Sequence, residues 1–275
     1  LGMIFFNVYR DYLYMIQSRI ENYSNKFQSI KNLVRGYYIM KSVTIYNCST
    51  FNITDSKTIL QSTTSNQNIS KKIPVGNIAP NAKDSIIVNK AKIIGFDCTY
   101  NITIKDSIIA LVNGDYIPVE QYQKSNSFPA FYSVDTKKLF VFAPSPIAQG
   151  FIKALSQTYP AEVTIKSPLD YDFNKIKVSE KYAKALYFKV DETQITSKHF
   201  FGAGVEQDDE AADAIDQNKA TYIIGDIDVS GRTRTIGFSK KGTVVFYSKP
   251  NDMLNLEYPY LQLTTDTLIA IQCWK

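Results

Sequence analysis

The chain has 275 residues, of which 44% are hydrophobic and 21% charged, and its formal net charge is +5. This composition is ordinary for a globular protein and excludes low-complexity and disulfide-rich classes. The only histidine, His199, excludes most imidazole chemistry, because a catalytic triad or a histidine metal site would have to use this one residue. Its aromatic surroundings favour a packed or surface histidine.

The three cysteines, Cys48, Cys98 and Cys273, are far apart and form no Cys-x-x-Cys pair. They predict no zinc or iron–sulfur site, and their odd number favours reduced thiols, with a Cys48–Cys98 bridge as the open alternative. The longest aliphatic run, Ile108 to Val112, is far shorter than the roughly 20 apolar residues of a membrane span. We therefore expect a cytoplasmic protein with no transmembrane segment and no cofactor.

The first 40 residues carry apolar side chains at alternating spacings of three and four, which is a heptad pattern. The pattern consists of Phe6, Tyr9, Leu13, Ile16, Ile20, Tyr23, Phe27, Ile30, Val34 and Tyr37. It predicts a long amphipathic helix over residues 1–40, about 50 Å in length. We expect residues 6–37 to form a coiled coil with a second copy. The alternatives are packing along the sheet of the same chain, a different protein partner and a membrane surface.

Residues 41–135 alternate with period two, which predicts a β-rich region. A polar, turn-rich stretch over residues 56–84 is interpreted as an exposed loop. Further along, two apolar segments flank Gly114-Asp115, and this pattern predicts strand, turn and strand over residues 108–119.

Residues 136–275 combine helix and strand patterns. Ser145-Pro146 is typical of an N-cap and a first helical residue, and the helix is expected to run to Gln157 between two strands, in a parallel crossover. No glycine-rich phosphate loop accompanies it. The remaining predicted elements are a helix over 179–186, a strand over 187–190, an antiparallel meander over 221–248 and a final strand over 267–272. The whole chain is therefore predicted to be α+β: a long N-terminal helix, then a β-rich body with short helices and a C-terminal meander.

Charge is distributed unevenly. Residues 201–217 contain six acids and no Lys or Arg, which leaves 31 basic against 20 acidic residues elsewhere, a balance of +11. A cationic body attracts polyanions, and nucleic acid is the commonest of these. Arg232 and Arg234 are two residues apart on a predicted strand and therefore share one face, with Lys240 and Lys241 in the next turn. These four residues are the predicted phosphate contacts, with a solvated strand face as the alternative.

The acidic stretch predicts a helix that begins after Gly202-Ala203-Gly204. Its carboxylates could hold Mg²⁺ or Mn²⁺ for phosphodiester cleavage, a reaction that needs no histidine. The candidate ligands are Glu206, Asp208, Asp209 and Glu210. The simpler interpretation is that acids in the first turn complement the helix dipole.

These observations favour a non-enzymatic nucleic-acid-binding protein, of a kind that a virus or mobile element encodes. The first alternative is a metal-dependent phosphodiesterase or nuclease that uses the acidic cluster 206–213. The second is a structural or assembly protein that forms homo-oligomers through the N-terminal helix.

Overall fold

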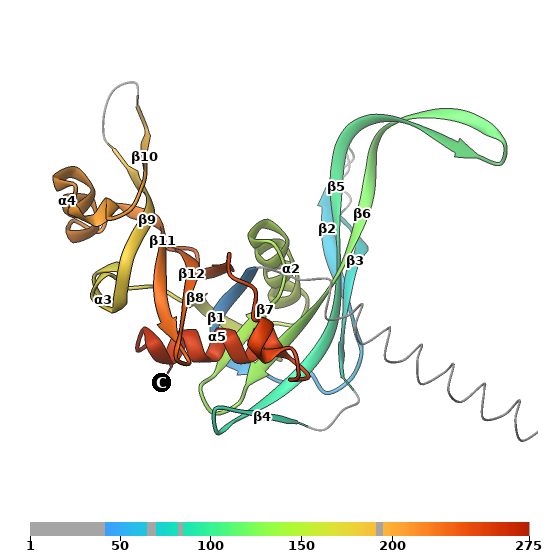
Figure 1. Cartoon of the computed structure of the whole chain (residues 1–275). Coiled ribbons are helices and arrows are strands. Elements are labelled where there is room, and N and C mark those ends of the chain that lie inside the picture. Colours follow the sequence, from blue (N-terminus) through green and yellow to red (C-terminus); the bar gives the residue numbers. More distant parts are fainter. Residues whose placement is uncertain (1–41, 65–69, 82–84, 191–194, 275) are drawn as a thin grey trace, which may run out of the picture. The chain divides into compact units, whose positions relative to one another are not determined.

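The computed structural model describes residues 42–64, 70–81, 85–190 and 195–274. The chain divides into two units, residues 1–40 and 41–275. The helix and coiled coil predicted within residues 1–40 lie outside the described residues. The described part of the second unit is mostly β and contains one antiparallel sheet of 13 strands with a few short helices (Figure 1). The β-rich body is thus confirmed, while α+β overstates its helical part.

The strands follow one another in the sheet in the order β10-β9-β11-β12-β13-β1-β7-β6-β5-β3-β2, with β4 paired to β5 and β8 to β1. Their bounds are β1 Ser42–Phe51, β2 Lys57–Thr64, β3 Ser70–Pro80, β4 Ile86–Val88, β5 Ala91–Val112, β6 Asp115–Ser133, β7 Lys138–Val141, β8 Val163–Pro168, β9 Glu180–Lys189, β10 Ser197–Phe201, β11 Ala220–Val229, β12 Arg232–Ser239 and β13 Thr243–Phe246.

Strand β1 joins the two halves of the sheet. Its residue Thr44 pairs with both Thr243 of β13 and Val141 of β7, so these two strands lie on opposite sides of β1. β1 is correspondingly buried, with Val43 and Ile45 fully enclosed. A domain boundary between residues 135 and 136 would cut the β6–β7 hairpin, which lies within the single unit 41–275.

Four α-helices occur among the described residues. They are α2 Ser145–Thr158, α3 Phe173–Ser179, α4 Asp209–Asp216 and α5 Pro259–Ala270, and two 3-10 turns are η1 Val205–Gln207 and η2 Asn251–Met253. Helix α2 buries Phe151 against Tyr100 of β5 and Phe128 of β6, with ring centroids 6.3 and 5.1 Å apart. Gly150 permits this approach, because a Cβ there would lie 2.8 Å from the Tyr100 ring.

Several predicted elements are confirmed. The meander over 221–248 is present as β11, β12 and β13, with both residues of the Ser230-Gly231 turn at positive φ. The helix after Ser145 also forms and ends one residue later than expected. Its N-cap is Pro144 rather than Ser145. The two strands that flank this helix, β7 and β8, run parallel as predicted, because each pairs antiparallel with β1. They are not neighbours in the sheet, because β1 lies between them.

Three predictions are wrong. The stretch 56–84, predicted as an exposed loop, contains strands β2 and β3, whose Ile59, Val75 and Ile78 are buried. Residues 180–189 form strand β9 in place of the helix over 179–186, because β9 has partners on both sides in β10 and β11. Residues 267–270 end helix α5 in place of a final strand, with buried Leu263, Thr264, Thr267 and Leu268. Their β-branched composition misled the prediction, because tertiary packing overrode local propensity.

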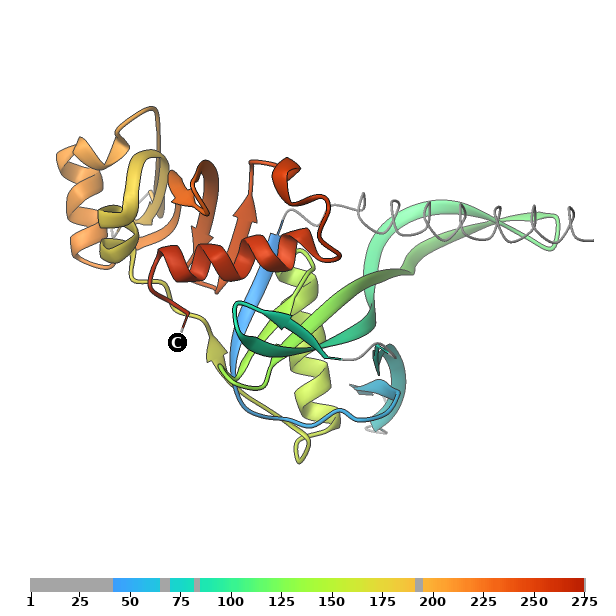
Figure 2. The ribbon, with the colours of Figure 1, turned by 60° about the horizontal axis from the view of Figure 1, so that its bottom comes forward.

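The hairpin of β5 and β6 is longer than its neighbours. Strand β3 pairs with β5 only up to Tyr100, and β7 pairs with β6 only from Ala130 onward, so the distal parts of both strands are bonded to each other alone. We call residues 101–126 the arm. The arm stands away from the rest of the sheet and bends near its tip (Figures 1 and 2). Within the arm, the pairing of β5 with β6 has a β-bulge between Lys105 and Ile108, and bulges bend a strand and increase its twist.

Candidate functional site

The two predicted arginines lie on one face of β12, as expected, and both reach the same carboxylate. Arg234 Nη2 donates to both Asp252 oxygens at 2.9 and 2.7 Å, and Arg232 Nε lies 3.5 Å from Asp252 Oδ2. The Arg234 side chain is only 3% exposed, whereas that of Arg232 is 63% exposed. The Arg234 side chain lowers the pKa of the Asp252 carboxyl by hydrogen bonding.

This ion pair gives Arg234 a structural role. A buried guanidinium bonded at both carboxylate oxygens is not accessible to a phosphate, and a paired, buried charge is costly to separate. Among the predicted phosphate contacts, Arg232 and Lys241 are exposed to solvent. Lys240 is largely engaged: its Nζ donates to Tyr171 O at 2.8 Å and lies 3.4 Å from Asp170 Oδ1 and 4.8 Å from the Phe173 ring centroid.

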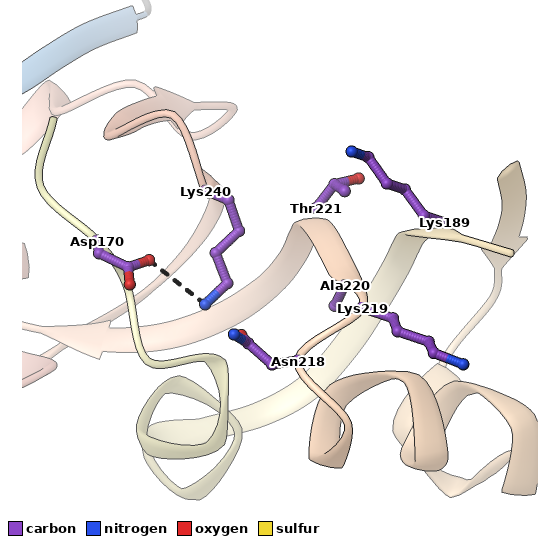
Figure 3. A pocket seen from close by; sticks show the side chains of 7 residues that line it. All are labelled: Asp170, Lys189, Asn218, Lys219, Ala220, Thr221 and Lys240. Carbon is purple, nitrogen blue, oxygen red and sulfur yellow. Dashed lines mark hydrogen bonds and ion pairs between the residues drawn. The ribbon is translucent and has the colours of Figure 1, made fainter. Parts of the chain in front are cut away.

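The structure instead gathers lysines from three elements around one open hollow of about 430 Å³ (Figure 3). The hollow is lined by Asp170, Lys189, Asn218, Lys219, Ala220, Thr221 and Lys240. Lys189 ends β9, Lys219 precedes β11, and the Lys189 N–H donates to Lys219 O at 3.2 Å. Both side chains are exposed and form no ion pair with another described residue. One carboxylate among three lysines leaves the hollow cationic, which suits an anionic ligand.

Sequence reasoning missed Lys189 and Lys219, because thirty positions separate them and neither belongs to a motif. Only the antiparallel pairing of β9 with β11 brings them together. The tight turn of Lys240 was identified correctly, but its partners Tyr171 and Asp170 come from a distant loop.

The four acidic residues proposed as metal ligands have separate roles. Asp208 caps α4 by accepting hydrogen bonds from the N–H groups of Glu210 and Ala211. Glu206 Oε2 accepts from Ala183 N at 3.0 Å, and Glu210 lies 2.6 Å from Lys198 Nζ. Asp209 is exposed in the first turn, where it complements the helix dipole. In the part of the chain that the structure describes, no group of three or more His, Cys, Asp or Glu side chains could hold a metal ion.

His199 and the cysteines are placed as structural or surface residues. His199 is exposed on β10 and stacks on Tyr187, with ring centroids 4.2 Å apart. Cys48 and Cys98 are buried free thiols, and Cys273 is half-buried. Burial raises the pKa of Cys48 to about 12 and that of Cys98 well above its ordinary value.

The arm carries several highly exposed large apolar side chains, among them Ile109, Leu111 and Tyr116. Because paired residues of a hairpin point to the same side, Leu111 and Tyr116 share a face with Ile109 and Pro118. The same face continues toward the sheet through residues of both strands. We call this surface the arm face: it comprises Ile102, Ile104, Ile109, Leu111, Tyr116, Pro118, Glu120, Tyr122, Lys124 and Asn126, with the bulge residues Asp106 and Ser107 opposite Glu120.

The arm face extends the side of the sheet that α2 covers. At the base of the arm, Tyr100 and Phe128 occupy the same alternation and pack against Phe151 of α2. Farther along the arm, Ile104 and Tyr122 are half-buried. Beyond the bulge, the apolar side chains of the arm face are exposed to solvent. The opposite face is polar up to the bulge, where it presents Lys105, Gln121 and Gln123 among other polar residues.

No protein-family model and no curated protein matches this chain. Among the described residues no helix is both long enough and apolar enough to cross a membrane.

Proposed function

We propose that this chain is an assembly protein that binds another protein chain through the arm face. The observation that carries the proposal is the exposure of large apolar side chains there: 73% for Ile109, 64% for Leu111 and 77% for Tyr116. Burial of apolar surface is the main favourable term in protein association. A ribbon of two strands cannot cover its own faces, so a second surface must do so.

The free energy gained by burying this apolar surface indicates how much of the arm takes part in binding. The exposed apolar area at the tip is on the order of 300 Å², which at about 25 cal/mol per Å² is worth roughly 7 kcal/mol when buried. Association costs about 4–15 kcal/mol in lost translational and rotational freedom. The tip alone therefore supports only a weak contact, and stable binding requires the half-buried Ile102, Ile104 and Tyr122 as well.

A neutral double substitution at the tip tests this proposal. Thr is polar and favours strands, so Leu111→Thr with Tyr116→Thr removes apolar surface and introduces residues that are compatible with the hairpin. The matched control is Gln121→Thr with Gln123→Thr on the opposite face. We expect the full chain and the control to retain polypeptides from the cells that express the protein, and the tip variant to lose them. Equal retention by all three proteins would refute a role for the arm face.

We also propose polyanion binding as a second function, and the cationic hollow is the observation that favours it. This proposal keeps the nucleic-acid partner but moves the contacts to Lys189 and Lys219, with exposed Lys241 and Arg232 as auxiliary contacts. Each phosphate contact releases counterions, so affinity for an oligonucleotide should fall steeply with salt.

The test compares DNA and RNA oligonucleotides over a range of salt concentrations. Lys189→Gln with Lys219→Gln should weaken binding and reduce the salt slope by about 1 for each lysine. The control, Lys92→Gln with Lys153→Gln, removes two exposed lysines away from the hollow. An unchanged slope in the first variant, or an equal loss in the control, would rule out the hollow as the contact.

A further inference from the structure

We infer that strands β9 to β13 stack unpaired bases on one face, so that the polyanion held at the cationic hollow is a single-stranded nucleic acid. The inference rests on the second proposed function, polyanion binding, and names the class of ligand. It is carried by aromatic side chains that cross the sheet beside Lys189. We call them the aromatic row, and its members are Phe201, His199, Tyr187, Tyr222 and Tyr247.

Strand pairing places the row on one face of the sheet. Tyr187 of β9 is paired with His199 of β10 on one side and with Tyr222 of β11 on the other, and paired residues point the same way. Phe201 follows His199 by two residues and therefore shares its face. The Tyr187 ring stacks on His199, with centroids 4.2 Å apart. It also lies 5.6 Å from the Phe201 ring and 5.4 Å from the Tyr222 ring, so the rings are in contact across three strands.

Gly237 of β12 allows the row to continue to Tyr247, the residue after β13. The hydroxyl groups of Tyr222 and Tyr247 are hydrogen-bonded at 3.0 Å. A Cβ at position 237 would lie 2.7 Å from Tyr222 Cζ and 3.2 Å from Tyr247 Cε2, so the glycine leaves room for both rings. The row thus reaches across the five strands β10-β9-β11-β12-β13, about 19 Å at the usual strand spacing.

The outer side of the row is open to solvent. Phe201 is 68% exposed, Tyr247 is 51% exposed, and His199 is exposed as well. The opposite face of the same strands belongs to the core, where Phe246 packs on Tyr260 of α5 with ring centroids 5.9 Å apart. A sheet face that carries exposed aromatic side chains can stack two or three unpaired bases, because every base has a π-face.

Cations that could hold phosphates lie on one flank of the row. Lys189 follows Tyr187 by two residues, so it shares the face about 7 Å farther along β9, and it lines the cationic hollow together with Lys219 (Figure 3). On the other flank Lys184 is already engaged, because its Nζ lies 2.7 Å from Asp226 Oδ1. The phosphates of a bound strand therefore belong at the hollow, and its bases belong over the row.

A duplex and an apolar protein surface fit this arrangement less well. The bases of a duplex are already paired and stacked, so a duplex offers phosphates to the hollow but no free base to the row. An apolar protein surface laid over the row would bury Lys189 without a counter-charge, which is costly. A single strand supplies base faces and phosphates together.

The experiment measures binding of the full chain to a single-stranded oligonucleotide, to the same sequence as a duplex and to pyrophosphate, over a range of salt concentrations. The original chain should bind the single strand more tightly than the duplex. Phe201→Val with Tyr247→Val removes two ring faces with residues that favour strands, and should weaken single-strand binding roughly fivefold or more for each ring. Stacking neutralises no phosphate, so the slope of log affinity against log salt should stay the same, and pyrophosphate binding should not change.

Two further variants serve as matched controls. Phe201→Tyr with Tyr247→Phe keeps both ring faces and should bind the single strand like the original chain. Tyr182→Val removes a ring that is 55% exposed on the same face, but Tyr182 is paired with Asp226 on the flank away from the hollow. This substitution should change the affinity less than twofold.

Several results would overturn the inference: equal affinity of the original chain for single strand and duplex, a valine variant that binds the single strand unchanged, an aromatic-retaining variant as weak as the valine variant, or equal losses for single strand and duplex. In each case polyanion binding still stands if Lys189→Gln with Lys219→Gln weakens binding of the duplex. If the chain binds neither nucleic acid nor pyrophosphate, the second proposed function fails as well. Competition by polyglutamate as strong as that by the oligonucleotide would instead assign the row to an acidic polypeptide.

Discussion

The ion pair between Arg234 and Asp252 yields the sharpest prediction about stability. Arg234 is 3% exposed and bonds both oxygens of Asp252, whose side chain is 17% exposed. Asp252→Asn keeps the shape but leaves the guanidinium buried without a counter-charge, a change that costs about 3–5 kcal/mol. Because water reaches part of Asp252, we expect the lower end, about 3 kcal/mol. For a protein of this size that is a fall in Tm of roughly 6–12 °C.

Urea unfolding followed by fluorescence measures this cost, because the single tryptophan, Trp274, lies against core residue Phe140 with ring centroids 6.1 Å apart. Arg232→Met is the matched control. Arg232 approaches the same carboxylate but is 63% exposed, so its loss should cost less than about 1 kcal/mol. Equal costs for Asp252→Asn and Arg232→Met, or a cost below 1 kcal/mol for both, would refute the argument from burial.

The same pair predicts an acid dependence. The pKa of Asp252 is lower in the folded protein than in the unfolded chain, mainly because Arg234 donates hydrogen bonds to the carboxylate. The ion pair therefore contributes its full stability above the unfolded-state pKa of about 3.9, and the contribution is lost as the pH falls through the lower folded-state pKa. We expect the free-energy difference between the original chain and Asp252→Asn to be constant near neutral pH and to shrink below about pH 4. A difference that does not change with acid would contradict the assigned ion pair.

Two further predictions concern packing. Gly231 and Gly242 have nearly the same φ, +75° and +76°, but a Cβ at Gly231 meets nothing within 4 Å while one at Gly242 lies 2.7 Å from Ile45 O. In urea unfolding, Gly231→Ala should cost about 1 kcal/mol for its backbone conformation, and Gly242→Ala roughly 1–3 kcal/mol more for the clash; equal costs would contradict the contact. Alkylation of the folded protein at pH 8, read by mass spectrometry, should label Cys273 well before Cys48 or Cys98, because the two buried thiols stay protonated. Labelling of all three at one rate would show that the sheet opens around them.

The parts of the fold that could be predicted are those set by local chemistry. Ser230-Gly231 and the glycine at position 242 fix the turns of the meander at positive φ. The turn of the arm lies at Asn113-Gly114, one residue before the predicted Gly114-Asp115, because Asp115 already pairs with Val112 in the hairpin. The polar strands β2 and β3 could not be read in the same way. Their assignment depends on partners far along the chain, such as β5, and their polar side chains lower the contrast between strand and loop.

The candidate sites show the same contrast between features set by local sequence and features set by distant partners. Alternation along β12 correctly placed Arg232 and Arg234 on one face, but it could not show that Asp252, eighteen residues beyond Arg234, closes that face. The apolar segments of the arm predicted strand, turn and strand, and their apolar character alone would suggest burial. The exposure of Leu111 and Tyr116 depends on tertiary structure. The two side chains are exposed because β3 and β7 stop pairing with the hairpin before the arm begins.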